Sequence, residues 1–310
     1  MIVTSKAPVA ALDCGTNSTR LLIADEDGRT LSRLMRVTRL GEGVDATHVL
    51  APQAIERTVA VLADYRRMMD EHGVDRARLV ATSAVRDATN GEEFLEAAGH
   101  ATGTVAELLS GDEEGRLSFA GATAGMAPQT GDDVVVDIGG GSTELVLRHG
   151  DGIGAISLDM GCVRLSERYL LDDPPTRGQL AALTAAVRVE LERATIALPG
   201  LSDLAPESRL IGLAGTVATV AALEQGLVEY DREMVHHFVL EKEAIDRWAS
   251  TLANESAAAR LSRPGMDPGR QDVIVGGVVI LSEVLSLCRL DECLVSESDI
   301  LDGLVASLLG

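Results

Sequence analysis

The sequence predicts an α/β fold built from two related halves, each with its own mixed β-sheet. Two segments carry this prediction, because residues 9–24 (VAALDCGTNSTRLLIA) and residues 133–148 (DVVVDIGGGSTELVLR) share one pattern. With a shift of 124 positions, Asp13 aligns with Asp137, and a Gly, a Ser and a Thr of the following turns coincide. Elsewhere strand-like apolar runs alternate with apolar residues at helical spacing, which is typical of α/β layers.

The first half opens with three consecutive strands, which argues against a purely parallel sheet. Turn residues separate these strands, first at GTNS and then at Asp25–Gly28. After Pro52, apolar residues recur at helical spacing up to His72 and Gly73. The expected strands are 9–13, 19–24, 29–36, 78–82 and 105–109, and the expected helices are the one after Pro52, 92–98 and 112–124.

The second half restarts the same strand–turn–strand pattern. Gly, Pro, Gln and Asp gather in residues 125–133, so this segment is the best candidate for a linker. We therefore expect an N-terminal domain at 1–125 and a C-terminal domain at 126–310. The expected strands are 134–137, 144–149, 153–159, 209–213 and 293–296, and the expected helices are 176–197, one ending at Glu224, 241–253, 270–288 and 300–309.

Composition narrows the class of protein. Only 2% of residues are aromatic, so the cores must be built from aliphatic side chains. No stretch approaches the ~18 apolar residues of a membrane helix, and Met1–Pro8 lacks the apolar region of a secretory signal. We therefore expect a cytoplasmic protein whose four cysteines are reduced thiols. The net charge of −21 argues against nucleic acid and membrane partners.

The two repeated turns have the chemistry of phosphate sites. A strand that ends in Asp and runs into a Gly/Ser/Thr turn offers N–H groups and hydroxyls to a phosphate, and the Asp can hold a divalent cation. A tight turn alone would explain the first copy, but three successive glycines at 139–141 are costly in backbone entropy. A third element, Gly212–Thr216, lies where a strand enters a helix, and helix-to-sheet packing is its plain alternative.

Further motifs accompany these turns: ATSAVRDATN at 81–90, SGDEE at 110–114, MGCVRL at 160–165, and RPGM with RQDVI within 263–274. Together they resemble the exopolyphosphatase/guanosine-pentaphosphate phosphatase family of the actin/hexokinase/heat-shock-ATPase superfamily. The resemblance covers nearly the whole chain. It implies two duplicated ribonuclease-H-like (actin-like ATPase) domains, with mixed sheets that flank a cleft.

The resemblance also implies roles for particular residues. Glu114 corresponds to the catalytic glutamate that positions or deprotonates the attacking water, and Glu113 is its rival. Acidic residues also simply favour a helix N-terminus. Asp13, Asp137 and Glu144 are the expected metal-facing carboxylates, with Mg²⁺, or alternatively Mn²⁺, as the ion. The expected substrate-binding residues are Gly15, Thr16, Asn17, Ser18, Arg86, Gly139, Gly140, Gly141, Ser142, Arg164, Gly215 and Thr216. For Arg20 and Arg270, a solvated surface position is an equal alternative.

The implied activity is removal of the terminal phosphate from inorganic polyphosphate by a homodimeric enzyme. Guanosine pentaphosphate is the second substrate, and the motifs do not separate the two. A sugar or acid kinase is a more remote alternative, opposed by Ser110–Glu114 and by the chain length; an actin-like filament protein is another. Longer family members continue beyond the position of Gly310, so we expect less surface here for a long polyanion and less dimer contact. Cys14 replaces an aliphatic residue, which its small side chain should make tolerable.

Overall fold

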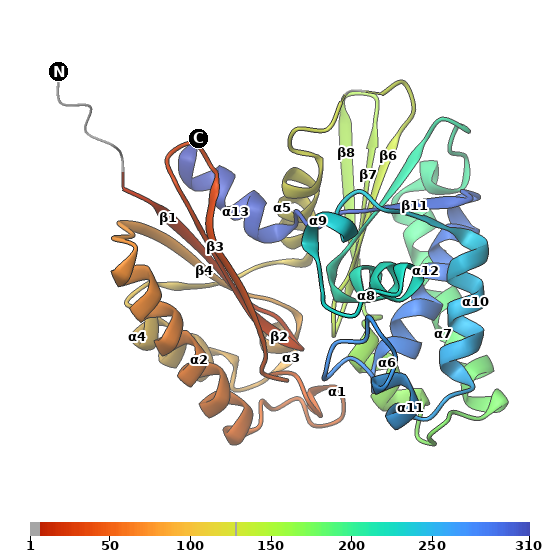
Figure 1. Ribbon diagram of the computed structural model, residues 1–310, viewed down its shortest axis with the longest axis horizontal. Helices are drawn as coiled ribbons and strands as arrows, with labels where there is room; N and C mark the ends of the chain where they lie inside the picture. Colours follow the sequence, from red (N-terminus) through yellow and green to blue (C-terminus); the bar gives the residue numbers. More distant parts are fainter. Residues whose placement is uncertain (1–6, 128) are drawn as a thin grey trace. The chain divides into compact units, whose positions relative to one another are not determined.

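The computed structural model describes residues 7–127 and 129–310, and the chain divides into two compact units (Figure 1). The first unit comprises residues up to Gly121 together with Asp299–Gly310, and the second comprises Ala122–Ser298. Pro128, inside the predicted linker, lies outside the described residues. None of the described helices combines the length and the apolar character needed to cross a membrane. All four cysteines are buried and form no disulfide bond within the described residues.

The first unit contains a five-stranded mixed sheet with the order β3-β2-β1-β4-β5. Its first three strands form an antiparallel meander, and the last two run parallel to the first. The mixed character follows the prediction from the three opening strands. The bounds are β1 (Val9–Cys14), β2 (Ser18–Ala24), β3 (Thr30–Val37), β4 (Arg76–Ala81) and β5 (Ala106–Leu108).

Every residue of β1 is buried, because helices cover both faces of this sheet. Side chains alternate along a strand, so Ala10 and Leu12 point to one face and Val9 and Ala11 to the other. The first face carries α2 and α4 and the second carries α13, as Figure 1 shows. The bounds are α1 (Val44–Thr47), α2 (Pro52–Glu71), α3 (Ser83–Asp87), α4 (Gly91–Thr102), α5 (Gly111–Thr123) and α13 (Ile300–Leu309).

The structure places α13 in the first unit, whereas the sequence analysis assigned it to the C-terminal domain 126–310. This last helix belongs to the first unit, where Ile300, Leu301 and Leu304 pack against Val9 and Ala11 of β1. Gly303 permits the close approach, since a Cβ there would overlap the carbonyl of Leu117 on α5. An apolar stripe reveals that a helix is half-buried, but not which sheet it covers, and this explains the difference.

The second unit contains a six-stranded sheet with the order β10-β11-β9-β6-β7-β8. Its part β8-β7-β6-β9-β11 repeats the order and directions of β3-β2-β1-β4-β5. The predicted duplication is therefore confirmed at the level of topology. The bounds are β6 (Asp133–Ile138), β7 (Thr143–His149), β8 (Gly152–Leu158), β9 (Arg209–Leu213), β10 (Val239–Glu241) and β11 (Glu292–Val295).

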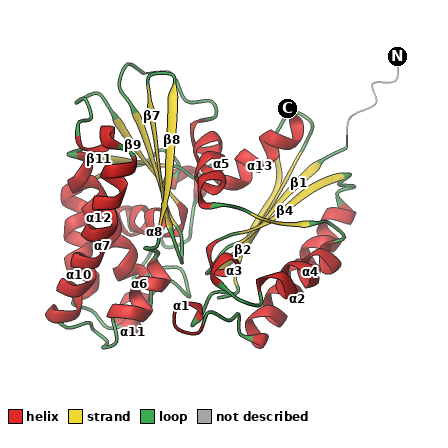
Figure 2. Ribbon diagram, turned by 180° about the vertical axis from the view of Figure 1, so that it is seen from behind, coloured by secondary structure: helices red, strands yellow, loops and turns green. Residues whose placement is uncertain are grey.

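The helices of the second unit build an aliphatic core. Figure 2 shows α7, α10 and α12 side by side, and α12 is buried on nearly every side. The predicted helix 270–288 begins only at Ile274, because residues 262–273 form an irregular segment. The bounds are α6 (Cys162–Tyr169), α7 (Arg177–Ala197), α8 (Ala214–Gln225), α9 (Arg232–Val235), α10 (Lys242–Ala253), α11 (Ala257–Leu261) and α12 (Ile274–Cys288), with a 3-10 turn at Pro199–Ser202.

The packing of α13 makes a testable stability prediction. Leu304 is fully buried, whereas Leu308 on the same helix is only partly buried. Leu304→Ala should lower the free energy of unfolding by about 2–5 kcal/mol, the usual cost of such a cavity. Urea denaturation measures the loss. Leu308→Ala is the matched control and should cost clearly less; equal losses would mean that α13 does not hold the first unit together.

Candidate functional site

The two repeated turns bring a glycine similarly close to the carbonyl three residues later. In the first unit, the Gly15 N–H donates to the carbonyl of Ser18 at 3.0 Å. A Cβ on Gly15 would lie 3.2 Å from that carbonyl oxygen, and a Cβ on Gly139 would lie 3.1 Å from the carbonyl of Ser142. Both turns are therefore tight at the same position, which agrees with the alignment of the two segments.

The first turn is supported by the residues that follow β3. The Asn17 carbonyl accepts from the N–H groups of Thr38 and Arg39, at 3.1 and 2.9 Å, and the Thr16 carbonyl accepts from Gly41. Asn17 is only 6% exposed, and its side-chain Nδ2 has no hydrogen-bond partner within the described part of the chain. A buried donor without a partner is costly and suits an anionic ligand such as phosphate.

Asp13, at the end of β1, is paired with Arg20 of β2. The two residues are register partners, and Asp13 Oδ2 accepts from Arg20 Nε and Nη2 at 2.9 and 2.6 Å. Asp13 Oδ1 is buried and has no partner among the residues described. Burial raises the pKa of Asp13 above its usual value, although Arg20 opposes this effect. Arg20 is therefore a part-buried partner of Asp13 rather than a solvated surface residue.

The second unit has carboxylates at both equivalent positions. Asp137 of β6 is the register partner of Glu144 of β7, and both side chains are buried. Ser157 Oγ donates to Glu144 Oε1 at 2.7 Å. Side chains directly opposite each other in a sheet lie on the same face, and like charges there repel. Carboxylate oxygens are the preferred ligands of a hard divalent cation, so this pair could hold one.

No cluster of three or more His, Cys, Asp or Glu side chains that could hold a metal occurs in residues 7–127 and 129–310. Asp137 and Glu144 offer two carboxylates. Mg²⁺ is commonly bound in this way, through one or two carboxylates plus water and phosphate. The residues present fit such an ion.

The glycine turn of the second unit is fixed against the first turn of α6. The carbonyls of Gly139 and Gly140 accept from the N–H groups of Cys162 and Val163, each at 2.9 Å. In a trans peptide the carbonyl and the next N–H point in opposite directions, so the N–H groups of Gly140 and Gly141 face away from α6. Arg164 adds a bond from Nε to the Gly141 carbonyl at 2.6 Å. The loop thus presents donors on its outer side.

The third predicted element lies at the N-terminus of α8. Its first residue, Ala214, has a φ of 67°, a conformation that costs energy for a residue other than glycine. Gly215 follows, and a Cβ there would overlap the guanidinium of Arg270. Thr216 is buried, and its hydroxyl is so close to Gly277 of α12 that no Cβ fits between them. Its backbone N–H is therefore a better candidate donor than its predicted hydroxyl.

Arg270 lies in a buried position that the sequence left open. It is 9% exposed, and its Nε has no hydrogen-bond partner in the described residues. The segment around it is anchored on either side of Arg270: Arg263 stacks on Trp248 at 5.3 Å, and buried Arg260 donates to the carbonyl of Gln271. The motif at 263–274 therefore brings one guanidinium to the start of α8, where an anion is also favoured.

Two adjacent glutamates at the start of α5 have different partners. Glu113 Oε2 accepts from the N–H and the hydroxyl of Ser110, at 3.1 and 2.9 Å, and these bonds hold the pKa of Glu113 below its usual value. This reciprocal arrangement is a capping box. The Glu114 side chain is only 12% exposed and lies 3.4 Å from Nη1 of Arg86. Glu113 is thus engaged in helix capping, while Glu114 is held beside an arginine.

The motif at 81–90 contains one residue that supports the backbone and one that could bind a ligand. Arg86 Nη1 also donates to the Leu109 carbonyl at 2.9 Å, which fixes the arginine beside the start of α5. Asn90 instead bonds to both the N–H and the carbonyl of Leu50, at 2.8 and 3.1 Å. Asn90 therefore supports the backbone, and Arg86 is the residue of this motif that could meet a ligand.

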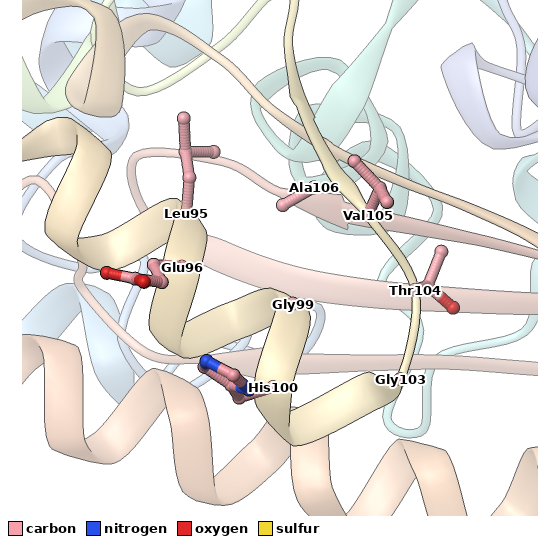
Figure 3. Close-up of a pocket in the computed structure, with 8 residues that line it drawn as sticks. All are labelled: Leu95, Glu96, Gly99, His100, Gly103, Thr104, Val105 and Ala106. Atoms are coloured by element: carbon pink, nitrogen blue, oxygen red, sulfur yellow. The ribbon is translucent and has the colours of Figure 1, made fainter.

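A surface pocket of about 450 Å³ lies between α4 and β5 of the first unit (Figure 3). Its titratable side chains are Glu96 and His100, and none of the predicted site residues lines it. The pocket is therefore separate from the residues that the sequence predicts to bind substrate.

Comparison with known proteins defines the class. Residues 21–310 match the Ppx/GppA phosphatase family, and the chain belongs to this family. Exopolyphosphatase 2 of Mycobacterium tuberculosis is 41% identical over 97% of this chain and 98% of its own length. A bifunctional 3-dehydroquinate synthase/phosphatase of Fusobacterium nucleatum is 33% identical over 96% of this chain, but only 46% of that protein is covered.

Solved structures agree with the fold. A crystal structure of an exopolyphosphatase-like protein matches with a TM-score of 0.90 and 37% identity, covering 97% of this chain and 98% of the other. The Aquifex aeolicus member of the Ppx/GppA family matches with a TM-score of 0.80 and 34% identity, covering 98% of both chains. The predicted family and the predicted fold, two duplicated actin-like domains with mixed sheets, are both confirmed.

Proposed function

We propose that this chain is an exopolyphosphatase that hydrolyses the terminal phosphate of inorganic polyphosphate. Family membership and the likeness to a relative named exopolyphosphatase support the reaction class. The observation that carries the proposal is the second turn, where outward-facing N–H groups of Gly140 and Gly141 adjoin the opposed carboxylates Asp137 and Glu144. Donors for phosphate oxygens next to ligands for a cation suit a phosphoanhydride better than an uncharged substrate.

The proposed chemistry needs little more than an oriented water. Its oxygen attacks the terminal phosphorus, the bond from that phosphorus to the bridging oxygen breaks, and Glu114 accepts the proton of the water. Hydrolysis of this kind depends on positioning and on neutralisation of the phosphoryl oxygens rather than on covalent intermediates. Arg86, which lies beside Glu114, is the proposed partner of those oxygens, and Arg164 and Arg270 are candidates in the second unit.

The proposed cation is Mg²⁺, with Mn²⁺ as the alternative, held by Asp137 and Glu144. Such an ion supplies positive charge that offsets the phosphate oxygens. Asp13 differs from this pair because Arg20 already occupies its Oδ2 atom, which leaves only Oδ1 for water or an ion. Guanosine pentaphosphate remains the second substrate, because nothing in the motifs distinguishes it from polyphosphate. The homodimer and the cytoplasmic location also remain predictions.

The assignment of the general base can be tested with two neighbouring substitutions. Glu114→Gln should slow turnover by about 10²–10⁴-fold, the usual range for loss of a general base, while the fold persists. Glu113→Gln is the matched control and should cost far less, because its carboxylate caps α5. Steady-state phosphate release measures both. Equal losses, or a dead Glu113→Gln, would remove Glu114 from this role.

The cation assignment makes a separate prediction. Asp137→Asn and Glu144→Gln should raise the Mg²⁺ concentration needed for half-maximal activity by about tenfold or more, because an amide binds the ion less well than a carboxylate. Asp132→Asn is a control in the same unit, since the Asp132 side chain is bonded to His149 instead. Unchanged Mg²⁺ titrations in both site variants would exclude this pair.

A phosphate-release panel tests the function itself, with polyphosphates of several lengths, guanosine pentaphosphate and ATP as substrates. We expect polyphosphate to be the best substrate. A chain at −21 repels a long polyanion, while a few arginines act only within a Debye length of ~8 Å. Short and intermediate chains should therefore be preferred, and added salt should ease hydrolysis of long ones. Release from ATP but not from polyphosphate would contradict the proposed function.

A further inference from the structure

A chain of five alternating charges runs through the first unit, from Asp13 at the end of β1 to the start of α13. Arg20 Nη1 donates to Asp299 Oδ2 at 2.5 Å, in addition to its two bonds to Asp13. Arg33 Nη2 donates to Asp299 Oδ1 at 2.9 Å and to Asp302 Oδ2 at 2.8 Å. A residue near the C-terminus is therefore connected, through one guanidinium, to a carboxylate of the first turn.

Asp299 also caps α13. Its Oδ1 accepts from the Leu301 N–H at 2.9 Å, and its own N–H donates to Asp302. Capping needs only a hydrogen-bond acceptor, and Asn serves as well as Asp at this position. The negative charge, in contrast, is unfavourable in a residue that is only 8% exposed, unless cations surround it. Capping alone therefore does not explain why residue 299 carries a negative charge.

Other contacts besides the one between Arg20 and Asp299 attach α13 to the first unit. The apolar face of α13 packs on the sheet, and at its other end Arg76 donates to the Leu308 carbonyl at 2.6 Å and Arg78 to the Ser307 hydroxyl at 2.9 Å. Arg33 and Asp302 provide a further ion pair at its start. The bond between Arg20 and Asp299 is thus one of several links, and it is the one that leads to Asp13.

The shape of the guanidinium explains what this link does. Its nitrogens lie in one rigid plane, so a bond that holds Nη1 also fixes the edge formed by Nε and Nη2. That edge faces Asp13 Oδ2, which receives both of its donors. The bond to Asp299 thereby constrains the direction from which Arg20 meets Asp13. Oδ1 of Asp13 is the atom without a partner in the described residues.

We propose that Asp299 is a positioning residue for the first turn: through Arg20 it holds the Asp13 carboxylate in the orientation that the reaction requires. Arg20 and Arg33 hold the pKa of Asp299 below its ordinary value although burial opposes them, which keeps the charge in place. The inference rests on the proposed function, because it presumes that Asp13 belongs to the active site. It adds a residue from the last helix to that site's support.

Asp299→Asn tests the proposal, since it keeps the cap and the shape but removes the charge. Asp302→Asn, which changes the neighbouring carboxylate in the same helix turn, is the matched control. With polyphosphate, kcat of Asp299→Asn should fall about tenfold or more while KM stays within about twofold, since a small misplacement of a reacting group is costly. Asp302→Asn should retain the wild-type kcat.

A double-mutant cycle separates positioning from a general structural effect. If Asp299 acts through Arg20, Asp299→Asn should cause no further loss of kcat in an Arg20→Gln background. Additive losses would overturn the proposal, as would unchanged kcat in Asp299→Asn. If that variant fails to fold, Asp299→Ser provides another neutral cap; failure of both to fold would make Asp299 a stability residue and also overturn it. Polyphosphate hydrolysis by the wild type checks the proposed function independently.

Discussion

The register pair at the end of each central hairpin is the constraint on which the rest of the site depends. Antiparallel pairing places Asp13 opposite Arg20 in the first unit and Asp137 opposite Glu144 in the second. The strand register is the same in both places, and at the position opposite the aspartate the two units carry side chains of opposite charge. In the first unit an arginine pairs with the carboxylate, and in the second two carboxylates share one face of the sheet, where we propose a cation.

The arginines of this strongly acidic chain fall into two groups. Arg20 and Arg33 are engaged by Asp13, Asp299 and Asp302, so they stabilise the protein's own carboxylates. Arg86 and Arg270 lie instead beside Glu114 and Gly215. A net charge of −21 is thus compatible with phosphate chemistry. Salt screens the distant repulsion, whereas an arginine held by local contacts attracts a phosphate that lies within a few ångströms of it.

The sequence predicted the parts of the fold and site that depend on neighbours along the chain. The repeated strands and turns follow from alternation and from the spacing of Asp and Gly. The short helices α3 and α6 escaped prediction, because five to eight residues hold too little apolar periodicity. The burial of Arg270 and the placement of α13 depend on contacts between distant segments. The different partners of Glu113 and Glu114 became visible only with the hydrogen bonds between Ser110 and Glu113.

A direct measurement of cation binding tests whether the pair Asp137 and Glu144 holds the ion and the pair Asp13 and Arg20 does not. Mn²⁺ titration followed by electron paramagnetic resonance, with orthophosphate present, measures bound ion without relying on turnover. Glu144→Gln should weaken Mn²⁺ binding about tenfold or more, because a carboxylate binds the ion better than an amide. Asp13→Asn should leave Mn²⁺ binding nearly unchanged. Loss of binding in Asp13→Asn with full binding in Glu144→Gln would contradict this assignment.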